Sequence, residues 1–432
     1  MDALNTGNTA WMLASASLVL LMTPGLAFFY GGMVRGKSVL NIMMMSFGAI
    51  GVVGVIYMLW GYSMSFGSDV GGLFGNPFDF FGLKGLDDNA NALFSFEDLG
   101  VPAYVWVAFQ STFAIITVAL ISGSIPDRVK FGAWLLFAGL WVTLVYFPLA
   151  HMVWGGGLLG AEGITEGLST PLDFAGGTVV HINAGVAGLV LALIIGKRKG
   201  FGKEPMRPHN LPFVMLGAAL LWFGWFGFNA GSAGAANDQA GLAWITTTAA
   251  TAAAMVGWLI TEKFRDGHAT SLGAASGVVA GLVAITPAAG FVSPVGAIVI
   301  GLVAGVLCAL AVSLKYKFGY DDSLDVVGVH LVGGLWGTVS LGFFATADDL
   351  WAGSKAGLFY GGGVTQLLTQ VIVAVAAIVF TAIVTTIIAL AIKRTMGWRV
   401  TEDVEVGGID LAVHGESAYE TLGGARVVTE VK

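Results

Sequence analysis

Two histidines lie inside long apolar stretches of this sequence, where an ionisable side chain is costly and therefore points to function. His181 and His330 both stand in the pattern V-H-x-x-[AG]-G-x-x-G, over residues 180–188 and 329–337. Burial disfavours the imidazolium ion, so we expect both rings to be neutral at rest. Two neighbouring imidazoles can share a proton, one ring donating while the other accepts. The alternatives are two hydrogen-bonded core histidines, or a pair of haem ligands. Against the haem alternative, each apolar stretch has only one histidine at this depth, whereas stacked haems in a helical bundle would need more.

The elements that must position these histidines are membrane-spanning helices. The chain has 432 residues, of which 56% are hydrophobic and 11% charged, whereas a soluble domain carries about 25% charged residues. The apolar runs are about 20 residues long, which is enough to cross the hydrocarbon of a bilayer. The sequence predicts eleven spans, near residues 10–34, 41–66, 102–123, 131–153, 174–196, 212–232, 241–262, 270–287, 294–314, 326–346 and 363–393.

The order of the spans predicts an inverted repeat. The histidines fall in the fifth and tenth spans, an odd number of steps apart, so the two copies of the pattern run in opposite directions. Such a 5+5 arrangement places a functional site near mid-membrane, where the repeats meet. Repeat one covers about residues 10–196 and repeat two about 212–346, and the helix at 363–393 is left as a peripheral one.

The basic residues predict the orientation. All but two of the 20 Lys and Arg follow an odd-numbered span, and Lys84 and Lys355 are the exceptions. The positive-inside rule then places the N-terminus outside and the tail, 394–432, in the cytoplasm. The longest outer loop, about 67–101, is acidic, which either concentrates cations at the outer face or only keeps the loop soluble. It carries Asp69, Asp79, Asp87, Asp88, Glu97 and Asp98.

The remaining candidate residues carry less information. His209, His268 and His414 fall in predicted cytoplasmic segments and receive no role, and His151, at the outer end of the fourth span, is interpreted as structural. Cys308 is the one cysteine, which excludes a disulfide framework and a cysteine-based metal cluster. The first residues lack a basic region, so no cleavable signal peptide is expected. The 64 glycines indicate close helix packing.

Several long segments together resemble one known family, the ammonium transporters of the Amt/Mep/Rh superfamily, and its bacterial Amt type in particular. The likeness runs from the first span to residues 415–419 of the tail, and its motifs occur in the family's order. The segments that carry it are residues 23–32, 150–157, 173–184, 203–212, 224–232 and 325–330.

The resemblance implies roles for individual side chains. The outer ammonium site would be formed by Phe109, Trp154 and Ser232, since an aromatic face attracts a cation and a serine oxygen accepts an N–H. Phe113 and Phe228 would close the pore below it, and His181 and His330 would follow. The supporting residues would be Asp173, for which a helix N-cap is an equal interpretation, with Tyr146, Trp225 and Thr286.

The resemblance also implies what the protein does. We expect a transporter and not an enzyme, with a membrane domain at 1–393, no cofactor, no metal and no nucleic-acid partner. It would sit in the bacterial inner membrane as a homotrimer and serve nitrogen metabolism. It would carry ammonium as ammonia, with methylammonium as a substrate analogue, and dock a PII-type signalling protein on its cytoplasmic face. Three alternatives are a Rhesus-type neutral gas channel, an ammonium sensor, which usually carries a further signalling domain, and a haem-binding oxidoreductase.

Overall fold

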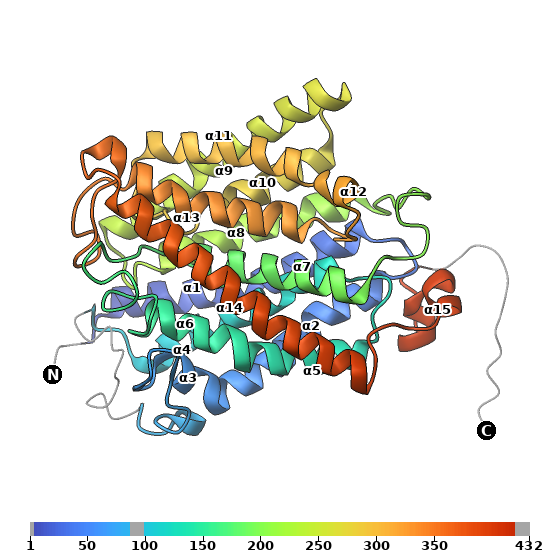
Figure 1. Cartoon of the computed structure of the whole chain (residues 1–432), viewed down its shortest axis with the longest axis horizontal. Helices are drawn as coiled ribbons and strands as arrows, with labels where there is room; N and C mark the ends of the chain where they lie inside the picture. The colour runs from blue at the N-terminus through green and yellow to red at the C-terminus, as the bar shows by residue number, and fades with distance from the viewer. Residues whose placement is uncertain (1–3, 87–98, 420–432) are drawn as a thin grey trace.

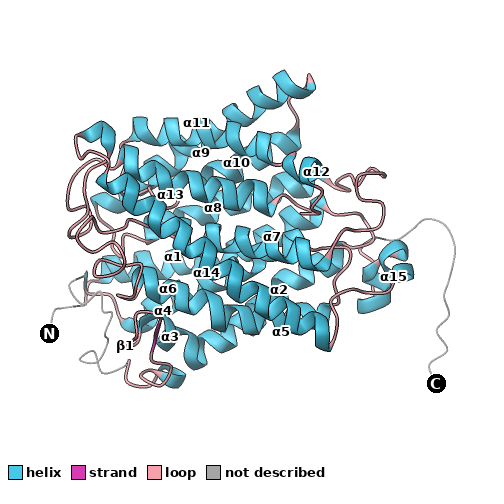
Figure 2. Cartoon of the chain, viewed as in Figure 1, coloured by secondary structure: helices cyan, strands magenta, loops and turns pink. Residues whose placement is uncertain are grey.

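The computed structural model describes residues 4–86 and 99–419, and these residues form one bundle of nearly parallel and antiparallel helices (Figure 1). Loops gather at the two ends of the bundle, and within the described part of the chain the strands form one short hairpin (Figure 2). Within the described residues, ten helices are long and apolar enough to cross a membrane. The predicted multi-pass membrane protein is therefore confirmed.

Most of the predicted spans correspond to one helix or to a helix continued by a π-helical turn. In chain order the elements are α1 (Thr6–Met33), α2 (Val39–Ile56), η1 (Tyr57–Gly61), α3 (Tyr62–Phe66), β1 (Asp69–Val70), β2 (Phe74–Gly75), η2 (Phe81–Leu83), α4 (Ala103–Ile121), η5 (Ser122–Ser124), α5 (Phe131–Trp141), η6 (Val142–Tyr146), α6 (Phe147–Trp154), η7 (Gly177–Ile182), α7 (Asn183–Ile195), α8 (Leu211–Gly231), α9 (Asp238–Asp266), α10 (Ser271–Ile285), α11 (Pro294–Ala311), α12 (Leu314–Phe318), η8 (Val327–Leu331), α13 (Val332–Phe344), η9 (Leu358–Tyr360), α14 (Thr365–Thr395), α15 (Glu402–Gly407) and η10 (Asp410–His414).

The segment expected as the eighth span is shorter than the others. Helix α10 has 15 residues, about 22 Å at 1.5 Å per residue, which is less than the thickness of the bilayer hydrocarbon. It is buried between its neighbours, and glycines bring α9 close to it. A Cβ built on Gly277 would lie 2.9 Å from the Met255 Cα, and one on Gly281 would lie 2.7 Å from the Thr251 Cα. The predicted close packing at glycines is confirmed here.

The long loop at about 67–101, predicted to face outward, begins with the hairpin of β1 and β2, whose strands pair antiparallel. Asp79 holds the loop that follows, because its carboxylate accepts hydrogen bonds from the Ser68 backbone N–H at 2.7 Å and from the Asn76 side chain at 2.7 Å. Asp87, Asp88, Glu97 and Asp98 lie outside the described residues, so the predicted acidic face is described only in part.

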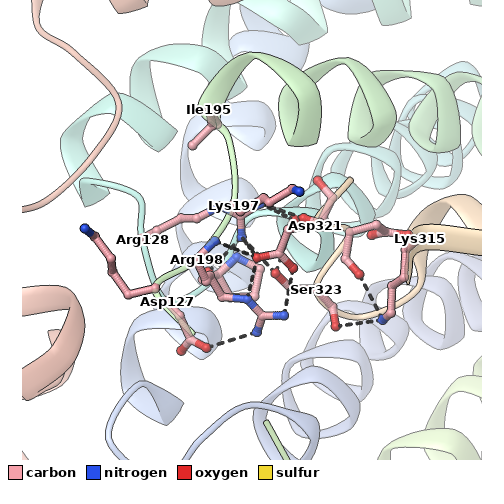
Figure 3. Close-up of polar contacts among 12 residues, drawn as sticks. Asp127, Arg128, Ile195, Lys197, Arg198, Lys315, Asp321 and Ser323 are labelled. Atoms are coloured by element: carbon pink, nitrogen blue, oxygen red, sulfur yellow. Dashed lines mark hydrogen bonds and ion pairs between the residues drawn. The ribbon is translucent and has the colours of Figure 1, made fainter. Parts of the chain in front are cut away.

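A buried ion-pair network joins distant segments at the other end of the bundle (Figure 3). The Arg198 guanidinium lies between two carboxylates, 2.8 Å from Asp321 and 3.3 Å from Asp127. Arg35 also contacts Asp127, at 3.2 Å, and Arg128 donates to the Asp321 carbonyl oxygen at 2.7 Å. Buried charges persist only when they are paired and hydrogen-bonded, and this network meets that condition by tying together loops from both predicted repeats.

The tail folds back onto this same end of the bundle. Asp410 accepts hydrogen bonds from the Leu40 and Asn41 backbone N–H groups at 3.0 and 2.8 Å, so a tail carboxylate caps the start of α2. Glu405 accepts from the Lys199 backbone N–H at 2.7 Å and also pairs with Arg399. The basic loop after α7 and the tail therefore form one continuous surface. Arg426 and Lys432, counted for the orientation, lie outside the described residues.

Candidate functional site

The two histidines of the repeated pattern lie side by side in the interior. The Nδ1 atoms of His181 and His330 are 3.2 Å apart, the rings are nearly parallel at 16°, and 1% and 3% of the residues' surfaces are exposed. One nitrogen must donate and the other accept, so the pair holds a single proton between the two rings. This distance is too short for an iron ion between the two nitrogens, which would need about 4 Å. The predicted pairing is confirmed, and the haem alternative does not fit it.

A buried aspartate stands eight residues before each histidine and organises the helix start. Asp173 accepts hydrogen bonds from four backbone N–H groups: 2.9 and 2.6 Å at residues 176 and 177, and 3.0 and 3.2 Å at residues 178 and 179. Asp322 accepts from two, at 3.1 and 2.8 Å. Each histidine follows in a π-helical turn, η7 or η8. The capping interpretation of Asp173 is confirmed, whereas Asp322 was missed, although its equal spacing to the histidine was a signal in the sequence.

The glycines of the repeated pattern allow the two copies to cross at the histidines. A Cβ added to Gly185 would lie 2.5 Å from the Leu331 backbone nitrogen, and one added to Gly334 would lie 2.8 Å from the His181 Cβ. Gly185 and Gly334 hold the same place in the two copies. Each copy therefore presents a bare backbone to the histidine region of the other, which explains why the pattern requires glycine there.

We expect Gly185→Ala to impair transport strongly, because the new methyl group meets a backbone atom that cannot turn aside. The transport rate should fall strongly. The thermal midpoint should also fall, because overpacking a core costs about 1–3 kcal/mol of folding stability. Gly51→Ala on α2 is the matched control, since its Cβ meets nothing within 4 Å. Equal behaviour of the two variants would contradict this account of the crossing.

The histidine pair lines a very small enclosed cavity. Its volume is about 10 Å³, which is room for about one water-sized molecule. Apart from His181 and His330, its walls are apolar or aromatic. These other walls are formed by Met22, Leu26, Phe29, Ile116, Leu120, Val180, Leu221, Trp225, Phe228 and Val279.

A hydrogen-bonded chain fixes the aromatic ring beside His181. Trp225 stacks on His181 with 5.4 Å between ring centroids and 15° between planes. Its indole N–H donates to the Thr286 hydroxyl at 2.8 Å, and that oxygen lies 3.3 Å from the Asn229 side-chain oxygen. The Asn229 amide in turn donates to Thr247 at 2.9 Å. Trp225 and Thr286 were predicted as supporting residues, whereas Asn229 and Thr247 were not, because the sequence shows no pattern that pairs them.

Two stacked phenylalanines separate this cavity from a wider one, called the outer cavity because it lies toward the end of the bundle that is predicted to face outward. The Phe113 and Phe228 rings are 4.0 Å apart at 12°, and Phe228 lines the inner cavity while Phe113 lines the outer one. The outer cavity has a volume of about 370 Å³ and is largely aromatic. Its aromatic walls are Phe66, Trp106, Phe113, Trp154, Phe174 and Trp351.

The residues predicted for the outer site lie around this cavity at different depths. Trp154 and Ser232 line it; the Trp154 indole donates to the Asp173 carbonyl oxygen at 2.9 Å, and the Ser232 hydroxyl donates to the Phe228 carbonyl oxygen at 2.8 Å. Phe109 lies behind the wall, with its ring centroid 4.8 Å from that of Phe113. Tyr146 is buried in η6 and lines neither of the two cavities.

Comparison with known proteins decides the family. The model of the Ammonium Transporter Family matches residues 10–419. The chain belongs to the ammonium transporter family. The "Ammonium transporter" of Mycobacterium tuberculosis is 59% identical over 430 residues, covering 96% of this chain and 90% of that protein. This ammonium transporter family member is therefore a multi-pass membrane transporter and not an enzyme.

Solved structures agree with the family. The crystal structure of Mep2 from Saccharomyces cerevisiae matches the ammonium transporter fold described here with a TM-score of 0.82 at 35% identity, over 92% of this chain and 91% of that one. A structure described as "Sensor Amt Protein" matches with a TM-score of 0.84 at 28% identity, over 94% and 98%. The chain is thus similar both to sequence relatives described as transporters and to a structure described as a sensor, so the fold alone does not separate the two functions.

Proposed function

We propose that the protein recruits ammonium in the outer cavity, removes its proton near Phe113 and Phe228, and conducts ammonia past His181 and His330. The observation that carries this proposal is that a wide and a narrow cavity lie on the two sides of one pair of stacked rings. A cavity of about 370 Å³ narrows at two stacked rings to one of about 10 Å³ beside paired imidazoles. A hydrated cation fits the first space and only a small desolvated molecule fits the second.

The outer cavity is suited to a cation. Trp154 supplies an aromatic face, worth about 0.5–2 kcal/mol to a cation, and the Ser232 oxygen has a lone pair free to accept an N–H while its own hydrogen is donated to Phe228. Phe109 supports this wall through its contact with Phe113. The narrow, mostly apolar inner cavity then favours neutral ammonia over the ion, because an isolated charge is costly to bury.

The proton left by ammonium has a route along the histidines. They share one hydrogen bond at 3.2 Å, so a proton arriving at one ring can be passed to the other. We infer that transport carries net charge. Current recording on proteoliposomes given an ammonium pulse tests the whole proposal, and the absence of both current and ammonium uptake would reject it.

The assembly and topology follow the family pattern in this proposal. Eleven spans in a 5+5 inverted repeat place the N-terminus outside and the tail in the cytoplasm, in an inner-membrane homotrimer that serves nitrogen metabolism. The surface formed by the basic loop at 197–207 and the tail would receive a PII-type signalling protein. Native mass measurement tests the trimer, and a pull-down from nitrogen-shifted cells that recovers no such protein would argue against the partner.

We expect Trp154→Leu to weaken ammonium recruitment more than it changes the pore. The substitution removes the cation–π face while Phe113 and Phe228 still separate the cavities. The ammonium concentration for half-maximal rate should rise roughly 3- to 30-fold, or discrimination against potassium should fall. Concentration-dependent currents measure both, and an unchanged half-saturation with unchanged selectivity would contradict the assignment.

A further inference from the structure

His151, which the sequence suggested to be structural, makes two polar contacts at the outer end of α6. Its ring is fully buried, and its Nδ1 lies 3.2 Å from the carbonyl oxygen of Ser65 at the end of α3. Its Nε2 lies 2.9 Å from a carboxylate oxygen of Asp69 in β1. One ring thus connects a membrane helix, a second helix and the outer hairpin.

Both partners of this ring are hydrogen-bond acceptors. A carbonyl oxygen can only accept, and an ionised carboxylate can only accept, so the two contacts are satisfied together when both ring nitrogens carry a proton. That form is the imidazolium ion. The histidine pair in the pore differs, because there two ring nitrogens face each other and one of them can accept.

The Asp69 side chain is in its ionised form in this arrangement. It is 46% exposed to solvent, and its two oxygens also accept from the Gly72 backbone N–H at 2.9 Å. The hydrogen bond with His151, followed by that with Gly72, lowers the pKa of this carboxyl group. A buried imidazolium is thereby paired with a charge that remains in contact with water.

The other ionisable groups on the elements packed around α6 have their own surroundings. Asp79, beyond the hairpin, accepts from Ser68 and Asn76, and Asp173, before η7, is occupied by four backbone N–H groups. Tyr62 on α3 packs its ring on neighbouring aromatic rings, and Tyr146 lies in η6 of the same span. Asp69 is the charged side chain that contacts the His151 ring within the described residues.

The chain after α6 is wrapped tightly around this ring. A Cβ added to Gly155 would lie 2.5 Å from the His151 Nδ1, and one added to Gly157 would lie 3.1 Å from the His151 Cδ2. The hairpin holds the same turn from outside, because the Leu158 N–H donates to the Gly72 carbonyl oxygen at 2.8 Å. The turn cannot keep this shape if the ring moves.

The contacts of His151 stand next to two walls of the outer cavity. Ser65 directly precedes Phe66, and His151 lies three residues, less than one turn, before Trp154. Both aromatic residues line the cavity, as does Gly156 within the wrapped turn. The contacts of the imidazole ring therefore join two elements that each carry a wall of the outer cavity.

We propose that His151 and Asp69 form an imidazolium–carboxylate pair that positions the outer ammonium site by holding α3, the hairpin and α6 together. His151 is thus a positioning residue. It acts through Phe66 and Trp154 on recruitment of the cation and not on the pore, an inference that rests on the proposed function of the outer cavity. The pair is neutral as a whole, so it adds no net charge that would repel ammonium.

The first test measures transport. Asp69→Ala, His151→Gln and the double variant are compared in proteoliposomes, with Glu166→Gln as the control, since Glu166 is an exposed acidic residue in a different outer loop. Each single variant should raise the half-saturating ammonium concentration roughly 3- to 10-fold, the scale of losing the net contribution of one hydrogen bond, with little change in maximal rate. The double variant should match the His151→Gln variant, because both substitutions remove the same contact.

Three results of this test would overturn the proposal while the wild type still transports ammonium. They are an unchanged half-saturation, effects that multiply in the double variant, and a fall in maximal rate alone. If the His151→Gln variant fails to fold, the Asp69→Ala variant still decides the test, because it changes only a half-exposed residue of the hairpin.

The second test does not depend on transport. In protein labelled with ¹⁵N histidine, the His151 ring is assigned by the signals lost in the His151→Gln variant. At neutral pH both of its nitrogens should carry a proton, and Asp69→Ala should yield a ring with one bare nitrogen. A bare ring nitrogen in the wild type would contradict the imidazolium–carboxylate pair even if the outer site is confirmed. A wild type that transports no ammonium would reject the proposed function, but it would leave the protonation measured for His151 unaffected.

Discussion

Replacing both His181 and His330 with alanine is expected to abolish the current that an ammonium pulse evokes in proteoliposomes. The bare ion is penalised by several kcal/mol at mid-membrane, and the inner cavity holds about one small molecule, so charge must cross separately from ammonia. The facing rings are the titratable side chains that line this cavity. Loss of acid–base transfer typically costs about 100-fold or more in rate.

A carboxyl group also carries protons, so replacing one histidine with glutamate should retain part of the current. His268→Ala is the matched control, because it removes an exposed imidazole at the start of the segment before α10. Wild-type, ammonium-selective current from the folded double variant would show that the rings only line the pore, and the proton route proposed here would be wrong.

Replacing Asp173 with asparagine is expected to remove both transport and much of the stability of the fold. The side chain has the same shape, but its amide group would point N–H atoms at backbone N–H groups that now donate to a carboxylate oxygen. Unpaired buried donors cost about 1–3 kcal/mol each, so the thermal midpoint should fall steeply. The same substitution would disturb the indole of Trp154, which is bonded to the Asp173 carbonyl oxygen.

Asp322→Asn provides the matched comparison in the second repeat. Asp322 accepts two backbone hydrogen bonds where Asp173 accepts four, so its substitution should lower the midpoint by less. Thermal unfolding of the two purified variants, measured side by side, shows directly which substitution lowers the midpoint more. A larger loss at Asp322, or no loss at either position, would contradict the capping account.

The spans and the histidine pair could be predicted from the sequence because both leave a periodic or repeated signal. Apolar runs of the right length locate helices, and a pattern that occurs twice identifies residues that do equivalent work. The same comparison, extended eight residues upstream, would also have located Asp322. What marks Asp322 is its spacing to His330, and the spacing is visible only once Asp173 is recognised as part of the repeat.

The remaining features depend on contacts between polar residues far apart in the chain. Nothing in the sequence around Asp410 indicates that its carboxylate caps α2, and nothing around Asn229 indicates Thr247 as its partner. Such contacts have no period, because each is made by one residue at one point of close approach. The contacts of His151 could not be predicted for the same reason, since its partners Ser65 and Asp69 lie more than 80 residues earlier.

The size of the inner cavity affects the proton gradient across the membrane as well as the choice of the molecule that crosses it. A file of hydrogen-bonded water through a protein would discharge a proton gradient within moments. The space beside His181 and His330 has room for about one molecule, and stacked rings close it on the outer side. Such a constriction has no room for a continuous file of water, so in the proposed mechanism a proton can cross it only through the two histidine rings.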